Sequence, residues 1–302
     1  MKKSIFKYIF FVCYSLASLY ASSNNTQIQK YLDQAKKGDE SAMYNLGFSY
    51  FHGLLVNKDY QKAIYWYKSA AAKGNMEAIN NLGYMYANGI GVAKNETQAL
   101  QYYTKAANAN FVTAQLNLGL FYEKNPTTQN MKQAFFWLNK AAQGGNKIAQ
   151  NNLAKLYYNG TGTKTDFQKA FYWFQEASWQ EDSLAQYNLA MMYYSSEYVS
   201  YNKEKILFWL ERSANNGSHF AQLKLGDFYA QGEVATKDLK LAFKYYTYAA
   251  AQNQPKAMFK LGTFYFYGHG VNKDIIKAKE WLTKAVDLQY EDAILFKRNN
   301  NL

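Results

Sequence analysis

Small and apolar residues recur along the chain with a period of 36 residues, shortened once to 35. The marker is an alanine that starts each repeat: Ala42, Ala78, Ala114, Ala149, Ala185, Ala221, Ala257 and Ala293. Four residues later a leucine stands in each of the seven intervals, and eight residues later a tyrosine. Positions 0, 4 and 8 lie on one face of an α-helix. The pattern therefore predicts seven repeats over residues 42–292, each beginning with a helix that buries this face.

A second apolar stripe follows in every repeat. It begins at Ala63, Ala99, Ala134, Ala170, Ile206, Ala242 and Ala278. Three residues after each stands a large aromatic residue, and small pairs such as Ala70–Ala71 close the stripe. The aromatic residues are Trp66, Tyr102, Trp137, Trp173, Trp209, Tyr245 and Trp281. This spacing predicts a second amphipathic helix with the aromatic side chain in the core, and hence an all-α fold.

Two further columns describe how the helices of a repeat meet. The residue after each leucine is always small: Gly47, Gly83, Gly119, Ala154, Ala190, Gly226 and Gly262. We expect it to let the second helix approach closely. Before each second helix stands Asp59, Asn95, Asn130, Asp166, Asn202, Asp238 or Asp274. These side chains are predicted to cap the helix N-terminus, which accounts for the series without a metal or catalytic role.

Two repeats depart from the pattern between their helices. Most repeats carry glycines there, which supply positive φ angles. The third repeat is one residue short and has Glu123, Lys124, Asn125 and Pro126 instead, and the fifth has Ser195, Ser196 and Glu197. Altered turns are expected at both places.

The combined motif A-x-x-x-L-G-x-x-Y-x-x-G-x-G-V, followed by an Asp and by K-A-x-x-W-Y-x-x-A-A, resembles the Sel1-like repeat family, a relative of the tetratricopeptide repeats. The resemblance implies a right-handed α/α superhelical solenoid of seven helix-turn-helix repeats of about 36 residues. Residues 22–41 fit an N-terminal capping half-repeat, because Ala35 and Gly38 share the columns of Ala71 and Gly74. Residues 293–302 begin a further helix and turn polar, as expected of a C-terminal cap.

The N-terminus has the order of a secretory signal peptide. Lys2, Lys3 and Lys7 precede a mostly apolar stretch of 12 residues, and small residues follow, with Ala21 the expected cleavage edge. Residues 1–21 are therefore predicted to be removed and the protein to be periplasmic or secreted. An uncleaved anchor is the alternative. Cleavage would remove Cys13 and three lysines but no acidic residue, so the net charge would fall from +12 to +9.

Composition narrows the chemistry. The 302 residues include 2 Pro and 1 Cys, which excludes a collagen, a disulfide framework and a cysteine-based zinc module. No apolar run reaches the roughly 18 residues of a membrane-spanning helix. The excess of basic residues is scattered, which favours an acidic partner or an anionic surface over nucleic acid. Solvated helix faces explain the same charge without a partner.

Residues for catalysis or metal binding do not form a pattern. His52, His219 and His269 stand in three different repeats without the spacing of metal ligands, and no Gly-x-Ser-x-Gly nucleophile motif occurs. The Gly-x-Gly turns follow helices rather than strands, so they do not predict a nucleotide site. We therefore expect no catalytic residue, no metal and no cofactor.

One polar column is the candidate binding site. Three residues after each repeat alanine stand Asn45, Asn81, Asn117, Asn152, Asn188, Lys224 and Lys260. The resemblance to tetratricopeptide repeats implies that this column lies on the concave, first-helix surface, where asparagines bind the backbone of an extended peptide and lysines an acidic group. An amide both donates and accepts hydrogen bonds, which suits that role. The alternative is that the asparagines only join neighbouring repeats.

The leading hypothesis is a monomeric exported adaptor that binds a protein or peptide on its concave face, in envelope function or host interaction. Two alternatives remain. Cysteine-rich relatives are described as penicillin-binding or weak β-lactamases, but their paired cysteines are missing from the mature chain here. A structural envelope protein that binds peptidoglycan or another glycan is the other alternative.

Overall fold

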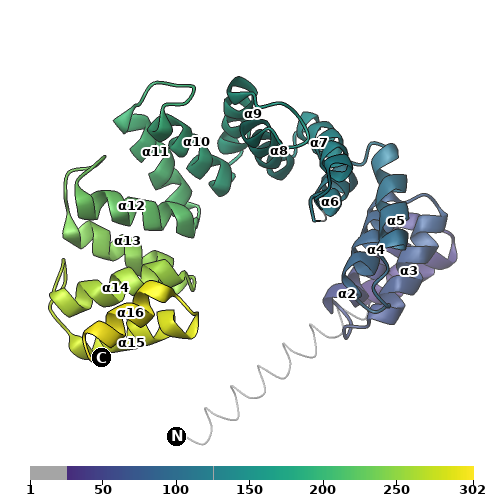
Figure 1. Ribbon diagram of the computed structural model, residues 1–302. Coiled ribbons are helices and arrows are strands. Elements are labelled where there is room, and N and C mark those ends of the chain that lie inside the picture. Colours follow the sequence, from purple (N-terminus) through teal and green to yellow (C-terminus); the bar gives the residue numbers. More distant parts are fainter. Residues whose placement is uncertain (1–25, 125) are drawn as a thin grey trace, which may run out of the picture. The chain divides into compact units, whose positions relative to one another are not determined.

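The computed structural model describes residues 26–124 and 126–302, and every regular element in them is a helix. The predicted signal peptide, residues 1–21, lies outside the described residues, as do residues 22–25 of the predicted N-terminal cap. The chain divides into two compact units that meet at Ala141 and Ala142. The described part is an all-α solenoid of repeated helical hairpins (Figure 1).

The described part of the first unit begins with a helix over residues 26–36 and continues with three hairpins. The hairpins consist of α2 (Glu40–His52) with α3 (Tyr60–Ala72), α4 (Met76–Asn88) with α5 (Glu96–Asn108), and α6 (Val112–Glu123) with α7 (Thr128–Gln143), whose last residues belong to the second unit. The second helix α3 packs on α4, and α5 packs on α6, so that each hairpin buries the next.

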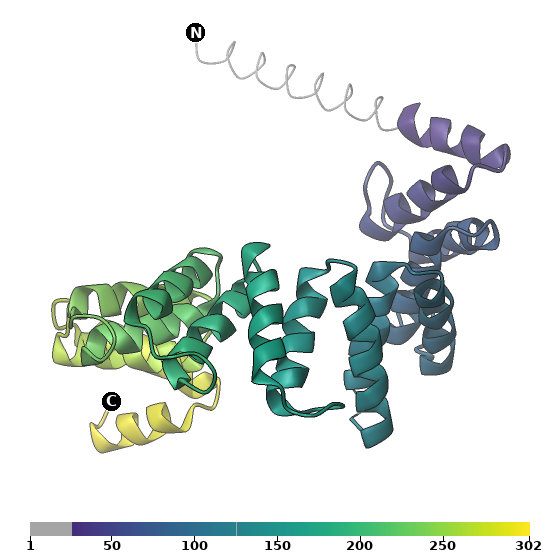
Figure 2. The same ribbon diagram turned by 90° about the horizontal axis from the view of Figure 1, so that it is seen from above.

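The second unit holds four hairpins and a final helix, on which the chain ends (Figure 2). They are α8 (Lys147–Asn159) with α9 (Phe167–Trp179), α10 (Ser183–Ser195) with α11 (Lys203–Asn215), α12 (His219–Gln231) with α13 (Leu239–Ala251), and α14 (Pro255–Tyr267) with α15 (Ile275–Asp287), followed by α16 (Glu291–Asn299). Each second helix again packs on the next first helix.

The predicted buried face of the first helices is confirmed for the alanine and leucine columns. Leu46, Leu82, Leu118, Leu153 and Leu225 have no exposed surface. The tyrosine column is mostly half-buried instead, and lysines of the second helices lie over several of its rings. The Nζ atom of Lys169, for example, lies 5.3 Å from the centroid of Tyr157. Apart from Tyr193, which is buried, the tyrosines therefore cover the edge of the core and stay partly accessible to solvent.

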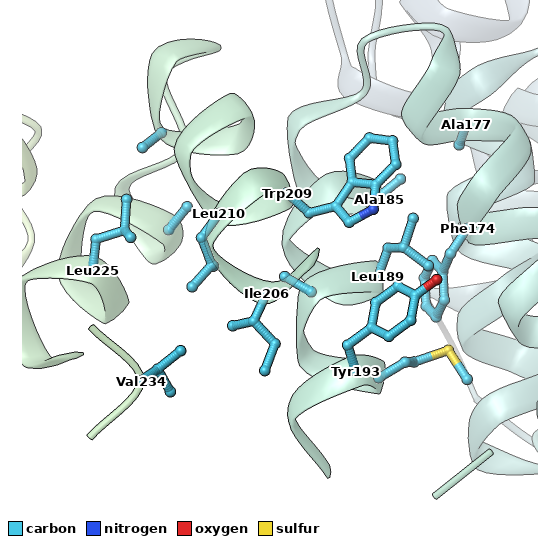
Figure 3. Packing of buried hydrophobic residues seen from close by; sticks show 14 of the residues in the cluster. Phe174, Ala177, Ala185, Leu189, Tyr193, Ile206, Trp209, Leu210, Leu225 and Val234 are labelled. Atoms are coloured by element: carbon cyan, nitrogen blue, oxygen red, sulfur yellow. The ribbon is translucent and has the colours of Figure 1, made fainter. Parts of the chain in front are cut away.

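The aromatic column predicted for the core of the second helices is wrong in most repeats. Trp66, Tyr102, Trp173, Tyr245 and Trp281 are half-buried, although Trp137 and Trp209 are buried. The buried column is the next one, formed by Tyr67, Tyr103, Leu138, Phe174, Leu210, Tyr246 and Leu282. Each residue of this buried column stands four positions after the first residue of the apolar stripe and three positions before the small residue that closes the stripe. The helix turns 100° per residue, so this position points more directly at the first helix. Figure 3 shows Phe174 facing Leu189 in the core of the second unit.

The small column of the first helices does allow a close helix approach, as predicted. A Cβ atom added to Gly226 would lie 2.6 Å from the ring of Tyr246, and one added to Gly83 would lie 2.7 Å from the ring of Tyr103. Such distances are too short for van der Waals contact. The glycines therefore face the buried residue of the second helix directly.

Six of the seven predicted helix caps are confirmed. The side chain of Asp166, for example, accepts a hydrogen bond of 2.9 Å from the backbone N–H of Lys169. Equivalent bonds are made by Asp59, Asn95, Asn202, Asp238 and Asp274. In the third repeat α7 begins earlier, and the Thr127 hydroxyl accepts from the N–H of Asn130 at 3.1 Å. Asn130 thus lies inside the helix rather than at its cap.

The two unusual turns differ from each other. In most repeats the residue that follows the first helix is a glycine in the left-handed region, as is Gly89 after α4, with φ 68°. In the third repeat the residue that follows α6 is Lys124, whose φ of −64° lies in the right-handed region. In the fifth repeat Ser196 takes the same left-handed conformation, with φ 60°. The turn is altered in the third repeat, but the fifth keeps the usual helix end with serine in place of glycine.

A buried glutamine column joins consecutive repeats, and the sequence analysis did not identify it. Gln115, Gln150, Gln186 and Gln222 directly follow the repeat alanines, and each is at most 6% exposed. Each donates through Nε2 to a backbone carbonyl at the end of the preceding second helix, as Gln186 does to Ser178 at 3.1 Å. Gln186 also accepts from Asn216 at 3.0 Å. Each of these carbonyls also accepts a backbone N–H of the turn that follows its helix, so the glutamine column adds a second hydrogen bond and ties each helix end to the next repeat.

Candidate functional site

Each unit contains a pocket between two consecutive first helices. In the first unit α4 and α6 form its walls, and Tyr103 of α5 contributes from the second helix. Its lining residues are Tyr84, Ala87, Asn88, Glu96, Tyr103, Asn117, Leu120, Phe121 and Lys124. In the second unit α8 and α10 form the walls, with Phe174 of α9. Its lining residues are Lys155, Tyr158, Asn159, Phe174, Asn188, Met191 and Met192.

The two pockets are the same site in two repeats. Their volumes are about 190 Å³ in the first unit and about 250 Å³ in the second. Counted from the repeat alanines, all seven residues of the second pocket match residues of the first. An asparagine of the candidate column lies in each pocket, Asn117 in one and Asn188 in the other. The shared site thus combines a polar amide with an aromatic second-helix residue, Tyr103 or Phe174.

The asparagines in the pockets are held by the preceding repeat. Asn117 donates through Nδ2 to Oδ1 of Asn80 at 2.8 Å, and Asn188 donates in the same way to Asn151 at 3.0 Å. Asn80 and Asn151 stand two residues after their repeat alanines and are buried. At these two positions the asparagines therefore join neighbouring repeats, which is the structural role that the sequence analysis gave as the alternative. One N–H of each amide is used, which leaves a second N–H and the carbonyl oxygen.

The other candidate residues lie on first helices but line neither pocket. Asn81 hydrogen-bonds to Tyr44 of the preceding repeat. Lys224 lies over the rings of Tyr194 and Phe228, with Nζ 4.6 and 4.5 Å from their centroids. The remaining three, Asn45, Asn152 and Lys260, are half-buried. The structure therefore places Asn117 and Asn188 in pockets and leaves the role of the whole column as a prediction.

Charge distinguishes the two pockets. In the first unit, Glu96 binds Lys94 at 2.6 Å, and this hydrogen bond lowers the pKa of the Glu96 carboxyl. In the second unit the charged lining residue is Lys155. Burial and a hydrogen bond to Glu197 raise the pKa of Tyr158 to about 12. The Tyr158 hydroxyl is therefore protonated at neutral pH and serves as a hydrogen-bond donor.

The chemistry available at these sites is that of binding. Apolar walls can take up a side chain, and amides can bind a peptide main chain. Across residues 26–124 and 126–302, no three His, Cys, Asp or Glu side chains gather as metal ligands would. None of the helices in this same range combines the length and apolarity needed to cross a membrane.

Comparison with known proteins identifies the repeats. The family model described as Sel1 repeat matches residues 40–75, 77–111, 112–146, 147–179, 183–218, 219–254 and 255–290. No curated protein matches the sequence.

Many solved structures are similar to this chain, and three of them show the range of sequence identity. A protective antigen present in uropathogenic Escherichia coli strains, displaying an SLR fold, is 29% identical with a TM-score of 0.77; the match covers 88% of this chain but only 57% of the antigen. A Sel1 repeat protein from Oxalobacter formigenes is 30% identical with a TM-score of 0.76, over 92% of this chain and 81% of that one. Yeast Tom70 shares the fold at 16% identity, with a TM-score of 0.55. The match covers 92% of this chain and 59% of the Tom70 chain.

The matched repeats extend over most of the chain, from residue 40 to residue 290. Sel1 repeat proteins are generally scaffolds for protein–protein interaction and are typically not enzymes. They bind protein partners, as related tetratricopeptide-like arrays do. The ranges matched by the family model fall on the helical hairpins described above, and the Oxalobacter formigenes protein shares their fold. The protein is therefore a member of the Sel1 repeat family.

Proposed function

We propose that this protein is an exported adaptor that holds a peptide or protein partner against its first helices. The observation that carries the proposal is the recurrence of one pocket at equivalent positions of two repeats, between α4 and α6 and between α8 and α10. Each pocket offers the same combination of apolar walls and an amide, which suits a ligand that presents side chains beside polar main-chain groups. A peptide has this property, because its side chains recur along a regular main chain.

The asparagine amides are suited to hold that main chain. The hydrogen bonds from Asn117 to Asn80 and from Asn188 to Asn151 fix the orientation of each amide in the unliganded protein. A group already held in place loses less side-chain entropy when a ligand binds. The second N–H and the carbonyl oxygen can then pair with a peptide C=O and N–H.

The asparagine contribution is testable by capture of partners from the native envelope with crosslinking. Joint Asn117→Ala and Asn188→Ala substitution is expected to weaken binding of the captured partner about thirtyfold, because each of the two substitutions removes a hydrogen bond that contributes about 1 kcal/mol. Binding is measured with the purified partner by titration calorimetry.

The matched control is joint Asn80→Ala and Asn151→Ala substitution. It removes the same two inter-repeat hydrogen bonds but keeps the amides in the pockets. We expect this control to retain most of the affinity. Equal affinity of the joint Asn117 and Asn188 variant and the unsubstituted protein would contradict a binding role for these amides.

Export is the second part of the proposal, and its support is the sequence order of lysines, apolar stretch and small residues in residues 1–21. When the full chain is expressed in a bacterium with an outer membrane, we expect recovery from the periplasm or medium with a new N-terminus after Ala21. N-terminal sequencing measures this directly. Recovery of the chain in the cytoplasm with Met1 intact would contradict export.

A further inference from the structure

We infer that the pocket of the second unit is an anchor site for a large apolar or aromatic side chain that neighbours an acidic residue in a peptide. This inference rests on the proposed function and specifies the ligand. The observation behind it is the pocket between α8 and α10, which is lined by Tyr158, Phe174, Met191 and Met192 beside Asn188.

The pocket has the size and lining for such a side chain. Its volume of about 250 Å³ exceeds that of a 150 Å³ apolar protein cavity known to bind benzene. Phe174 is 3% and Met192 is 2% exposed, so both are held by the surrounding core, while Met191 is half-buried. Methionine side chains adjust their shape and make favourable contacts with aromatic rings. The lining therefore suits a ring or a long unbranched chain.

Lys155 gives this pocket a positive charge that no lining carboxylate offsets, in contrast to the pocket of the first unit. In the first unit the equivalent position is Tyr84, and the lining there includes both Glu96 and Lys124. In the second unit no carboxylate lines the pocket, and Lys155 forms no ion pair within the described part of the chain. Glu197, which contacts the lining through Tyr158, accepts a hydrogen bond from that hydroxyl.

The lysine therefore selects the charge of the ligand. An amine at the rim of an apolar pocket attracts a carboxylate placed one residue from the buried side chain and repels a second amine. Asn159 and Asn188 line the same pocket and can bind the main chain between them. The favoured ligand is an acidic peptide with an apolar anchor, rather than a free hydrocarbon.

Blocked hexapeptides serve as probes, with the sequence Gly-Gly-Asp-Phe-Gly-Gly or Gly-Gly-Lys-Phe-Gly-Gly and 4-fluorophenylalanine as Phe. Binding to the full chain is measured by fluorine NMR titration at low ionic strength. We expect the Asp peptide to bind about fivefold more tightly than the Lys peptide, since ion pairs at exposed sites contribute up to about 1 kcal/mol. The preference should shrink with added salt.

Substitutions in the pocket test its location. Lys155→Glu is expected to reverse the preference between the two peptides. Met191→Trp fills the pocket and should weaken both peptides about tenfold, since it removes most of the space for the ring. Lys203→Glu, an equal charge change on α11, is the matched control and should leave both affinities unchanged. Leu120→Trp fills the equivalent pocket of the first unit and shows how far the probes use that pocket instead.

The outcomes separate this inference from the proposed function. The anchor site is overturned if Lys155→Glu leaves the preference between the two peptides unchanged. It is also overturned if binding is lost in Leu120→Trp but not in Met191→Trp. If the probes behave as expected while the joint Asn117 and Asn188 variant captures partners normally, the anchor site stands and the main-chain role of the asparagines falls. If the probes do not bind but that variant loses its partner, the proposed function stands without the anchor site.

Discussion

Replacing Phe174 with alanine is expected to lower the free energy of unfolding by about 3–5 kcal/mol, the usual cost of removing a fully packed aromatic ring. Phe174 is 3% exposed and lies in the core of the second unit, together with Leu189 and Tyr193 (Figure 3). Its neighbour Trp173 is the larger residue but is only half-buried. Trp173→Ala should therefore cost less, about 1–2 kcal/mol.

Urea unfolding followed by circular dichroism measures both variants. Phe174→Leu is the matched control, because leucine fills the same column in Leu138 and Leu210. We expect it to cost less than about 1.5 kcal/mol. A larger loss for Trp173→Ala than for Phe174→Ala would mean that the tryptophan column, and not the next one, carries the core.

Replacing Gly226 with alanine is expected to destabilise the protein by about 1–3 kcal/mol, the usual range for overpacking a core. At a helix position with space for a methyl group, the same change stabilises a protein by up to about 1 kcal/mol. A loss of stability would therefore show that the added methyl group clashes. The new Cβ would lie 2.6 Å from two ring carbons of Tyr246. The ring has little room to move, because it is 1% exposed and its hydroxyl donates to Asp227 at 2.8 Å.

A double-mutant cycle identifies the cause. In the fourth repeat the chain itself has Ala154 at this position, and the residue that matches Tyr246 is Phe174, which has no hydroxyl. Tyr246→Phe removes the hydrogen bond to Asp227, so the ring can shift away from the new methyl group. We therefore expect Gly226→Ala to cost less in the Tyr246→Phe background than alone. Purely additive costs would contradict the proposed clash.

The column that carries the stability also shapes the candidate site. Phe174 and Tyr103 are buried side chains of second helices, and each also lines the pocket between two first helices. A change at either residue therefore affects both packing and pocket shape. Met191, Lys155 and the pocket asparagines lie at the surface or at the pocket wall, so substitutions there change binding with less effect on the core.

The repeat, its helices and most of their caps could be predicted from the order of residues alone. Leu82 and Gly83, for example, recur with their counterparts at a fixed spacing, and the helix period turns that spacing directly into one buried face. An Asp or Asn before an apolar stripe acts within one turn of its own helix, so Asp166 could be assigned as a cap without knowledge of distant residues.

Which of two adjacent aromatic positions is buried depends on the packing of the facing helix. Trp173 and Phe174 both fit an apolar stripe, and they differ by one step of 100° around the helix. The same is true of the hydrogen-bond partners of the polar columns. Gln186 and Asn188 find their partners in another repeat, at Ser178 and at Asn151. Periodicity places such residues on a helix but does not specify the neighbouring helix, and a pocket exists only where two helices and a second-helix side chain meet.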